Sequence, residues 1–200
     1  MNQKPIRFII TLFACLAVLY PLWVRFGSLG WTLGPSILQS IFPALGLIAF
    51  AVLWLHVISG AFEPYLRTLF DFDRFVHRTS IIILICLILH PLLLLIDFDF
   101  NFSAVFAYGE KYILLAVIGW LLLITYDIGK ALKRYNFFVR HWNAILLIST
   151  TGFILTFLHS LALGSDLQAG PLRAVWIFYG ATAIPATVYN YGIKRFRQVR

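Results

Sequence analysis

The sequence predicts an all-α integral membrane protein, built as a bundle of six transmembrane helices. Of its 200 residues, 61% are hydrophobic and 12% are charged, which is a far more apolar composition than that of a soluble domain. Apolar runs long enough to cross a bilayer recur along the whole chain. Each run is continuously apolar, whereas the strands of a membrane β-barrel alternate between apolar and polar residues. We therefore expect one domain over residues 1–200, embedded in a lipid bilayer.

Six apolar segments separate naturally along the chain. The first follows a short basic start and could pass for a signal peptide, but Trp23, Arg25 and Trp31 stand where a cleavage site would need small residues. The glycine-rich stretch GSLGWTLGPS suits a loop before the second segment. The expected helices run approximately over Phe8–Val24, Ile37–Gly60, Phe75–Ile96, Tyr112–Ile128, Trp142–Leu163 and Leu172–Tyr191.

Lysine and arginine residues in the loops predict how the helices are oriented. When alternate ends of the six segments are taken together, only Arg25, Lys111 and Arg173 of the 16 basic residues fall on one side, and the other 13 fall opposite. Basic loops tend to stay in the cytoplasm, so both termini are expected there, with the acidic loops outside. Topology thus explains the net charge of +8 better than nucleic-acid binding does. We expect a multi-pass protein of a bacterial plasma (inner) membrane.

Two histidines lie deep inside apolar segments, where hydrocarbon has little tolerance for an imidazole without a partner. At the helical rise per residue, His90 lies ~22 Å along the third segment and His159 ~25 Å along the fifth. Because both segments run from inside to outside, the two residues are expected at nearly the same level, in the outer half of the bilayer. Two neutral imidazoles at matched depth on different helices can provide the axial ligands of a six-coordinate haem.

The same two histidines also fit a purely structural interpretation. An intramembrane histidine can hydrogen-bond to the backbone or a hydroxyl group of a neighbouring helix, and Thr156 and Ser160 lie near His159. A zinc or copper site is disfavoured, because no carboxylate or thiolate lies at this depth. A small histidine-containing transporter or a structural membrane subunit without haem is therefore the alternative function. The lack of Asp and Glu at the midplane counts against a transporter.

Three stretches of the sequence form a recognisable pattern: Asp73–Arg78 followed by an apolar run to His90, Gly119–Trp120, and Lys133–Trp142 followed by an apolar run to His159. This pattern resembles the ferric reductase-like transmembrane domain, which is shared by NADPH oxidases, ferric reductases and the membrane subunit of the bacterial periplasmic methionine sulfoxide reductase. The first stretch resembles the third helix of that domain, the second fits its fourth helix, and the last resembles its linker and fifth helix. In this family the third and fifth helices hold b-type haem between paired histidines. The resemblance implies that His90 and His159 ligate the iron of the outer haem.

The sequence departs from the family pattern at the inner haem. Members with two haems carry a second histidine on each helix, 13 or 14 residues before the first. His77 has this spacing from His90, but Leu146 and Ile145 occupy the matching positions before His159. Thirteen residues at 3.6 per turn also turn His77 away from the face of its neighbour. His77 is kept as a candidate cofactor ligand, with FMN or quinone binding, a contact with His56 or an interfacial position as alternatives.

The resemblance also implies a function. Complete reductases of the family continue into a cytoplasmic flavin and nicotinamide domain, whereas this sequence reaches Arg200 just past the sixth segment and has no glycine-rich dinucleotide loop. It therefore resembles the stand-alone, haem-binding type. That type is an electron-transfer subunit of an oxidoreductase system, without catalytic side chains of its own. Electrons would pass from a quinol or a cytoplasmic flavin reductase, through haem b, to a redox partner at the periplasmic or extracellular face.

The basic residues expected at the cytoplasmic edge have two interpretations. They can serve topology and contact anionic lipid, as is common for such residues. They can also steer an acidic electron donor or hold a haem propionate or flavin phosphate. The residues concerned are Arg67, Arg74, Arg78, Lys130, Lys133, Arg134 and Arg140.

Overall fold

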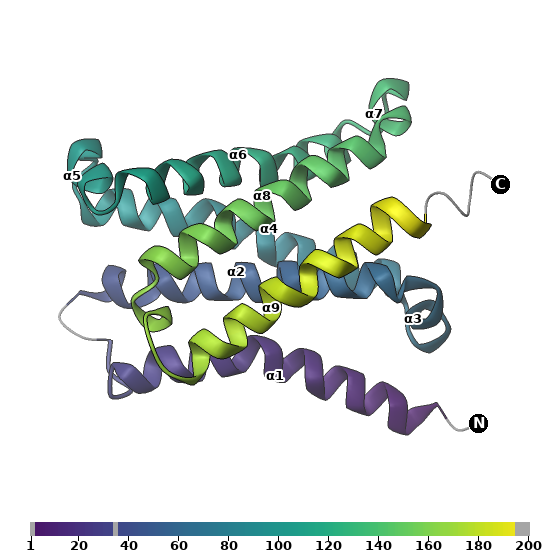
Figure 1. The fold of residues 1–200 in the computed structure, drawn as a ribbon, viewed down its shortest axis with the longest axis horizontal. Coiled ribbons are helices and arrows are strands. Elements are labelled where there is room, and N and C mark those ends of the chain that lie inside the picture. The colour runs from purple at the N-terminus through teal and green to yellow at the C-terminus, as the bar shows by residue number, and fades with distance from the viewer. Residues whose placement is uncertain (1–2, 34–35, 195–200) are drawn as a thin grey trace. The chain divides into compact units, whose positions relative to one another are not determined.

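The computed structural model describes residues 3–33 and 36–194, and helices make up most of this part of the chain (Figure 1). Within it, five helices are long and apolar enough to cross a membrane. The prediction of an all-helical, multi-pass membrane protein is confirmed for these residues. The five helices are α1 (Lys4–Ser28), α2 (Ile37–Ala61), α4 (Phe72–Asp97), α6 (Glu110–Ala131) and α8 (Trp142–Leu163).

The sixth expected segment corresponds to α9 (Pro171–Val188), which continues into the π-helical turn η2 (Tyr189–Ile193). This helix has 18 residues and is not among the five whose length and hydropathy together mark them as membrane spans. The prediction of six spans with both termini in the cytoplasm therefore stays a prediction. The basic residues of the expected C-terminal tail beyond Lys194 lie outside the described residues.

Several helices extend beyond their expected bounds because hydropathy locates only the apolar part of a helix. The expected start of the first helix was Phe8, but backbone hydrogen bonding begins at Lys4. The third expected segment, from Phe75, is α4 and begins at Phe72, where the carboxylate of Asp71 accepts the N–H of Arg74 at 3.0 Å. A carboxylate in this position satisfies one of the donors that a helix start leaves unpaired.

The chain divides into two compact units, Met1–Asp97 and Phe98–Arg200. In the first unit α2 packs against α1 and α4, and the short helix α3 (Glu63–Leu69) connects α2 to α4. In the second unit α6 packs closely against α8, and the short helix α7 (Asn136–Arg140) connects them. The second unit also contains α5 (Phe102–Ala107), before α6, and the turn η1 (Ser165–Leu167), before α9. Each unit therefore contains two long helices joined through a short one.

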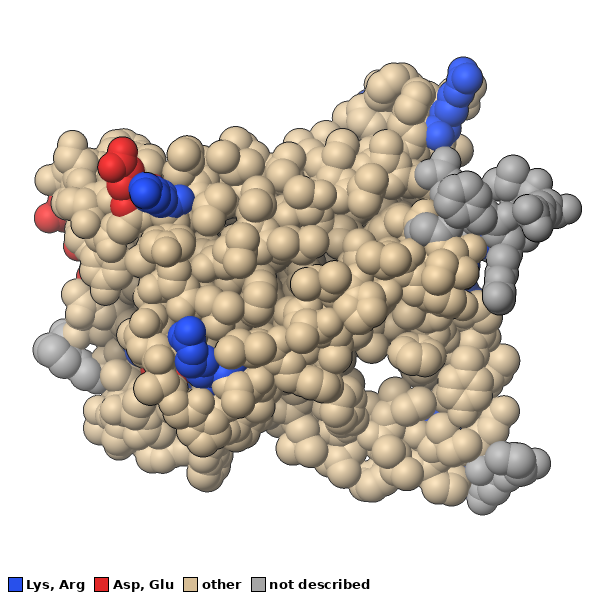
Figure 2. All heavy atoms as spheres, viewed as in Figure 1, with Lys and Arg blue, Asp and Glu red and all other residues tan. Residues whose placement is uncertain are grey.

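The outer surfaces of the helices are apolar, as contact with lipid requires. Large side chains such as Phe8, Ile81, Leu121 and Ile184 are exposed, by 68%, 46%, 54% and 53% respectively. Figure 2 shows charged side chains near helix ends, while uncharged atoms cover most of the helix middles. A soluble protein rarely exposes so much contiguous apolar surface to water. These surfaces support a bilayer as the surroundings of both units.

Pro43 removes one hydrogen bond from the interior of α2, and Arg25 replaces it. Proline has no N–H group, so the carbonyl four residues earlier, that of Gln39, loses its helical donor. Arg25 lies in the last turn of α1, is only 8% exposed, and donates from Nη2 to this carbonyl at 2.6 Å. The Gln39 side chain in turn donates to the carboxylate of Asp97 at 3.2 Å. These bonds tie the ends of α1, α2 and α4 together.

We expect the substitution Arg25→Met to lower the free energy of unfolding by about 1–3 kcal/mol, because it removes the donor from a buried carbonyl. In a Pro43→Ala background the backbone N–H is restored and can satisfy the same carbonyl, so the cost of Arg25→Met should fall. Unfolding of the four proteins of this double-mutant cycle, followed by helicity during titration with SDS, measures both costs. Equal costs in the two backgrounds would contradict this account of Arg25.

Candidate functional site

His90 lies in α4, with its imidazole against the backbone of α2. Its Nδ1 is 2.6 Å from the carbonyl oxygen of Phe42, and the centroids of the two rings are 5.7 Å apart. Gly46 leaves room for the imidazole, since a Cβ atom there would lie 3.0 Å from Cε1 and 3.1 Å from Nδ1 of His90. A carbonyl can only accept a hydrogen bond, so Nδ1 carries the proton and Nε2 keeps its lone pair. His90 is thus held in the tautomer that binds a metal through Nε2.

His159 repeats this arrangement in the second unit. It lies in α8, and its Nδ1 is 3.0 Å from the carbonyl oxygen of Tyr112, in the first turn of α6. The same reasoning places the proton on Nδ1 and the lone pair on Nε2. Both histidines are partly buried, and each is oriented by a main-chain carbonyl of the long helix that precedes it in its own unit. Metal-ligating histidines usually donate their other N–H in this way, which fixes the ring and its tautomer.

Two glycines let α6 and α8 approach each other closely. A Cβ atom on Gly152 would lie 2.6 Å from the carbonyl oxygen of Gly119, and a Cβ atom on Gly119 would lie 3.0 Å from the carbonyl oxygen of Gly152. Small residues at such a crossing allow the backbones of membrane helices to pack by van der Waals contact. This close packing holds the carbonyl of Tyr112 within reach of His159.

The hydroxyl groups near His159 donate to carbonyls of their own helix. Thr156 and Ser160 bond to carbonyl oxygens of α8 at 2.9 Å and 2.8 Å. The Ser160 hydroxyl also accepts from Nε1 of Trp176 at 2.9 Å, which joins α8 to α9. The bond of His159 to a neighbouring helix is therefore one to the backbone of α6. This bond occupies Nδ1 and is compatible with ligation through Nε2.

The other three histidines lie in different surroundings. His77 is exposed on α4. His56 lies in α2, and its Nε2 is 2.6 Å from the hydroxyl oxygen of Thr79 in α4. Since that hydroxyl donates to a carbonyl of α4 at 2.7 Å, it accepts from His56. His141 is exposed at the end of α7, where its Nδ1 is 2.9 Å from the carbonyl oxygen of Phe137.

A packing side chain occupies one of the two positions on α8 where a second haem would need its histidine. Ile145 is buried and fills the space above Gly129 of α6, where an added Cβ atom would lie 2.9 Å from Cδ1 of the isoleucine. At the other position, the main-chain carbonyl of Leu146 accepts the hydroxyl of Thr150 at 2.8 Å, which is a bond within α8. Ile145 therefore serves contact between α6 and α8.

Comparisons with known proteins add no identification. Among the residues that the structure describes, no group of three or more His, Cys, Asp or Glu side chains could hold a metal ion, so the candidate ligands are the individual imidazoles. No family model matches the chain, and neither does any curated protein or solved structure.

Proposed function

We propose that this protein is a membrane electron-transfer subunit that binds b-type haem through His90 and His159. The observation that supports this most is the arrangement shared by the two histidines. Each donates its Nδ1–H to a main-chain carbonyl, at 2.6 Å and 3.0 Å, so that Nε2 is the nitrogen through which each ring would ligate an iron. The iron of a bound haem would supply one-electron transfer in an apolar environment.

The residues of the chain would hold and orient this group. Hydrogen bonds from Nδ1 to the carbonyls of Phe42 and Tyr112 fix the two rings and raise the basicity of Nε2. The apolar surfaces of the long helices exclude water, which is one of the ways a protein sets a haem potential. No side chain of this site has to make or break a covalent bond in a substrate.

We further propose that the protein works in a bacterial plasma membrane. Electrons would enter from a quinol or a cytoplasmic flavoprotein and leave to a redox partner at the outer face. His90 and His159 lie toward the C-terminal ends of α4 and α8, and the distribution of basic residues favours an outer location for these ends. The exposed position of His77 fits a quinone or FMN head group at the helix edge better than a second haem.

A pyridine haemochrome spectrum of the purified, reduced protein tests the proposal. We expect a b-type band at about one haem per chain, since the two histidines would together hold one iron. The protein should be produced in cells supplied with a haem precursor, so that haem supply is not limiting. A colourless protein that is folded by circular dichroism would overturn the proposal and favour the transporter or structural subunit.

A further inference from the structure

We propose that the connection between α6 and α8 binds the headgroups of anionic phospholipids. This connection, residues 128–142, contains four basic residues and no acidic one, so its formal net charge is +4. Asp127, just before it, interacts electrostatically with Lys130. The other three cations, Lys133, Arg134 and Arg140, have exposed side chains. We call Lys133, Arg134 and Arg140 together the cationic surface.

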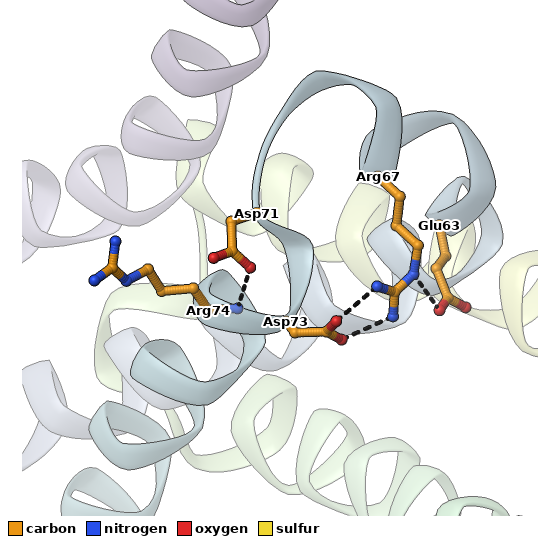
Figure 3. Close-up of polar contacts among 5 residues, drawn as sticks. All are labelled: Glu63, Arg67, Asp71, Asp73 and Arg74. Atoms are coloured by element: carbon orange, nitrogen blue, oxygen red, sulfur yellow. Dashed lines mark hydrogen bonds and ion pairs between the residues drawn. The ribbon is translucent and has the colours of Figure 1, made fainter.

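The corresponding connection in the first unit neutralises its own charge. Residues 62–78 contain three arginines and three acidic residues, so the formal net charge is 3 − 3 = 0. Figure 3 shows Arg67 between Glu63 and Asp73, with hydrogen bonds of 3.0 Å and 2.7 Å. The hydrogen bonds that the Arg67 guanidinium donates to Asp73, and then to Glu63, hold its pKa above the ordinary value. Of these two connections, only the one in the second unit therefore has a formal net positive charge.

Aromatic rings hold two cations of the cationic surface close to the polypeptide. Nζ of Lys133 lies 3.6 Å from the ring centroid of Trp142, and the guanidinium carbon of Arg134 lies 4.9 Å from that of Tyr135. Both distances are within the range of cation–π attraction. Tryptophan and tyrosine favour the headgroup level of a membrane, so these pairs place the cations where lipid phosphates lie.

Exposed apolar side chains distinguish a lipid from a soluble acidic protein as the partner. Tyr135, just before α7, and Phe137 and Val139 of α7 are exposed by 49%, 64% and 58%. A phospholipid supplies an anionic phosphate to the cations and an acyl region to these side chains. An acidic protein surface supplies the charge alone. The combination of cations and exposed apolar residues on one short connection therefore favours lipid.

The test uses the full-length protein in phosphatidylcholine bilayers that contain a trace of spin-labelled phosphatidylglycerol or spin-labelled phosphatidylcholine. Electron paramagnetic resonance measures the fraction of each labelled lipid that the protein immobilises. We expect the wild type to prefer phosphatidylglycerol. A basic residue near an anionic surface contributes roughly fivefold in affinity, so the triple substitution K133Q/R134Q/R140Q should remove most of this preference. The preference of the wild type should also weaken at high salt.

The matched control is the double substitution R67Q/D73N, which removes a cation of the first unit together with its partner. This double variant should prefer phosphatidylglycerol as strongly as the wild type does. Circular dichroism checks that both variants retain the helicity of the wild type. The proposal is overturned if the wild type shows no preference or if the triple variant keeps it. Binding of a soluble acidic protein that the triple substitution abolishes, without any lipid preference, would also overturn it.

Discussion

Replacing His159 with alanine is expected to remove the b-type haem band from the purified protein, and His90→Ala should do the same. Each substitution deletes one proposed axial ligand, so we expect the haem-to-protein ratio to fall at least about tenfold, as losses at metal-site residues commonly do. The carbonyls that orient the imidazoles lie within α2 and α6, where the helix supplies them with a second donor. The substitutions should therefore leave the helical content unchanged.

The matched control for both histidines is His141→Ala. His141 also donates from Nδ1 to a carbonyl, at 2.9 Å, but it is exposed at the end of a short helix. The His141→Ala protein should therefore keep the full b-type haem band. Added imidazole should restore the band to the His159→Ala protein, which separates loss of a ligand from loss of the fold. An unchanged band in either the His90 or the His159 variant would refute the proposed ligation.

The second large effect is expected at Gly152, where leucine should destabilise the second unit. A Cβ atom there would lie 2.6 Å from the carbonyl oxygen of Gly119 and 2.9 Å from the backbone nitrogen of Leu123. These are backbone atoms, so the clash can be relieved only if α6 and α8 separate. Overpacking typically costs about 1–3 kcal/mol, and a clash with backbone atoms should place Gly152→Leu at the upper end of this range. SDS titration followed by circular dichroism should show a lower midpoint than that of the wild type.

Gly27→Leu is the control for this substitution. Gly27 also lies in a long helix, α1, but an added Cβ atom there would meet nothing within 4 Å. The exchange should leave the midpoint unchanged or raise it, because leucine favours a helix more than glycine does. If the two substitutions shifted the midpoint equally, steric contact between α6 and α8 could not be the cause.

The long helices could be predicted from the sequence because each carries its own signal, an apolar run of membrane length. The expected fifth helix, Trp142–Leu163, has the same bounds as α8. The short helices α3, α5 and α7 were not predicted, since segments of five to seven residues show too little periodicity and are not stable alone. Packing supplies the missing stability, as where Leu66 and Leu69 of α3 join Phe72 in a buried cluster.

The candidate site could be predicted only in part. Residue type and depth singled out His90 and His159. That both imidazoles ligate one iron, as the haem proposal requires, is still a prediction. Their hydrogen-bond acceptors were missed because every residue carries a carbonyl, so no side chain marks Phe42 or Tyr112 as partners. The bond between His56 and Thr79 was missed as well, since His77 was considered as the neighbour of His56. A signal that could have helped is Gly46, whose missing side chain leaves space for an imidazole.

The use of main-chain acceptors has a consequence for how this protein can change over evolutionary time. The hydrogen bonds of His90 and His159 depend on the paths of α2 and α6, because their acceptors are main-chain carbonyls at positions 42 and 112. Substitutions at those two positions should therefore leave these bonds in place, although replacing Phe42 would remove its ring contact with His90. Position 46 should tolerate few residues other than glycine, because a larger residue there would displace the ring of His90. Selection on this site should thus act on space between helices more than on chemical identity beside the histidines.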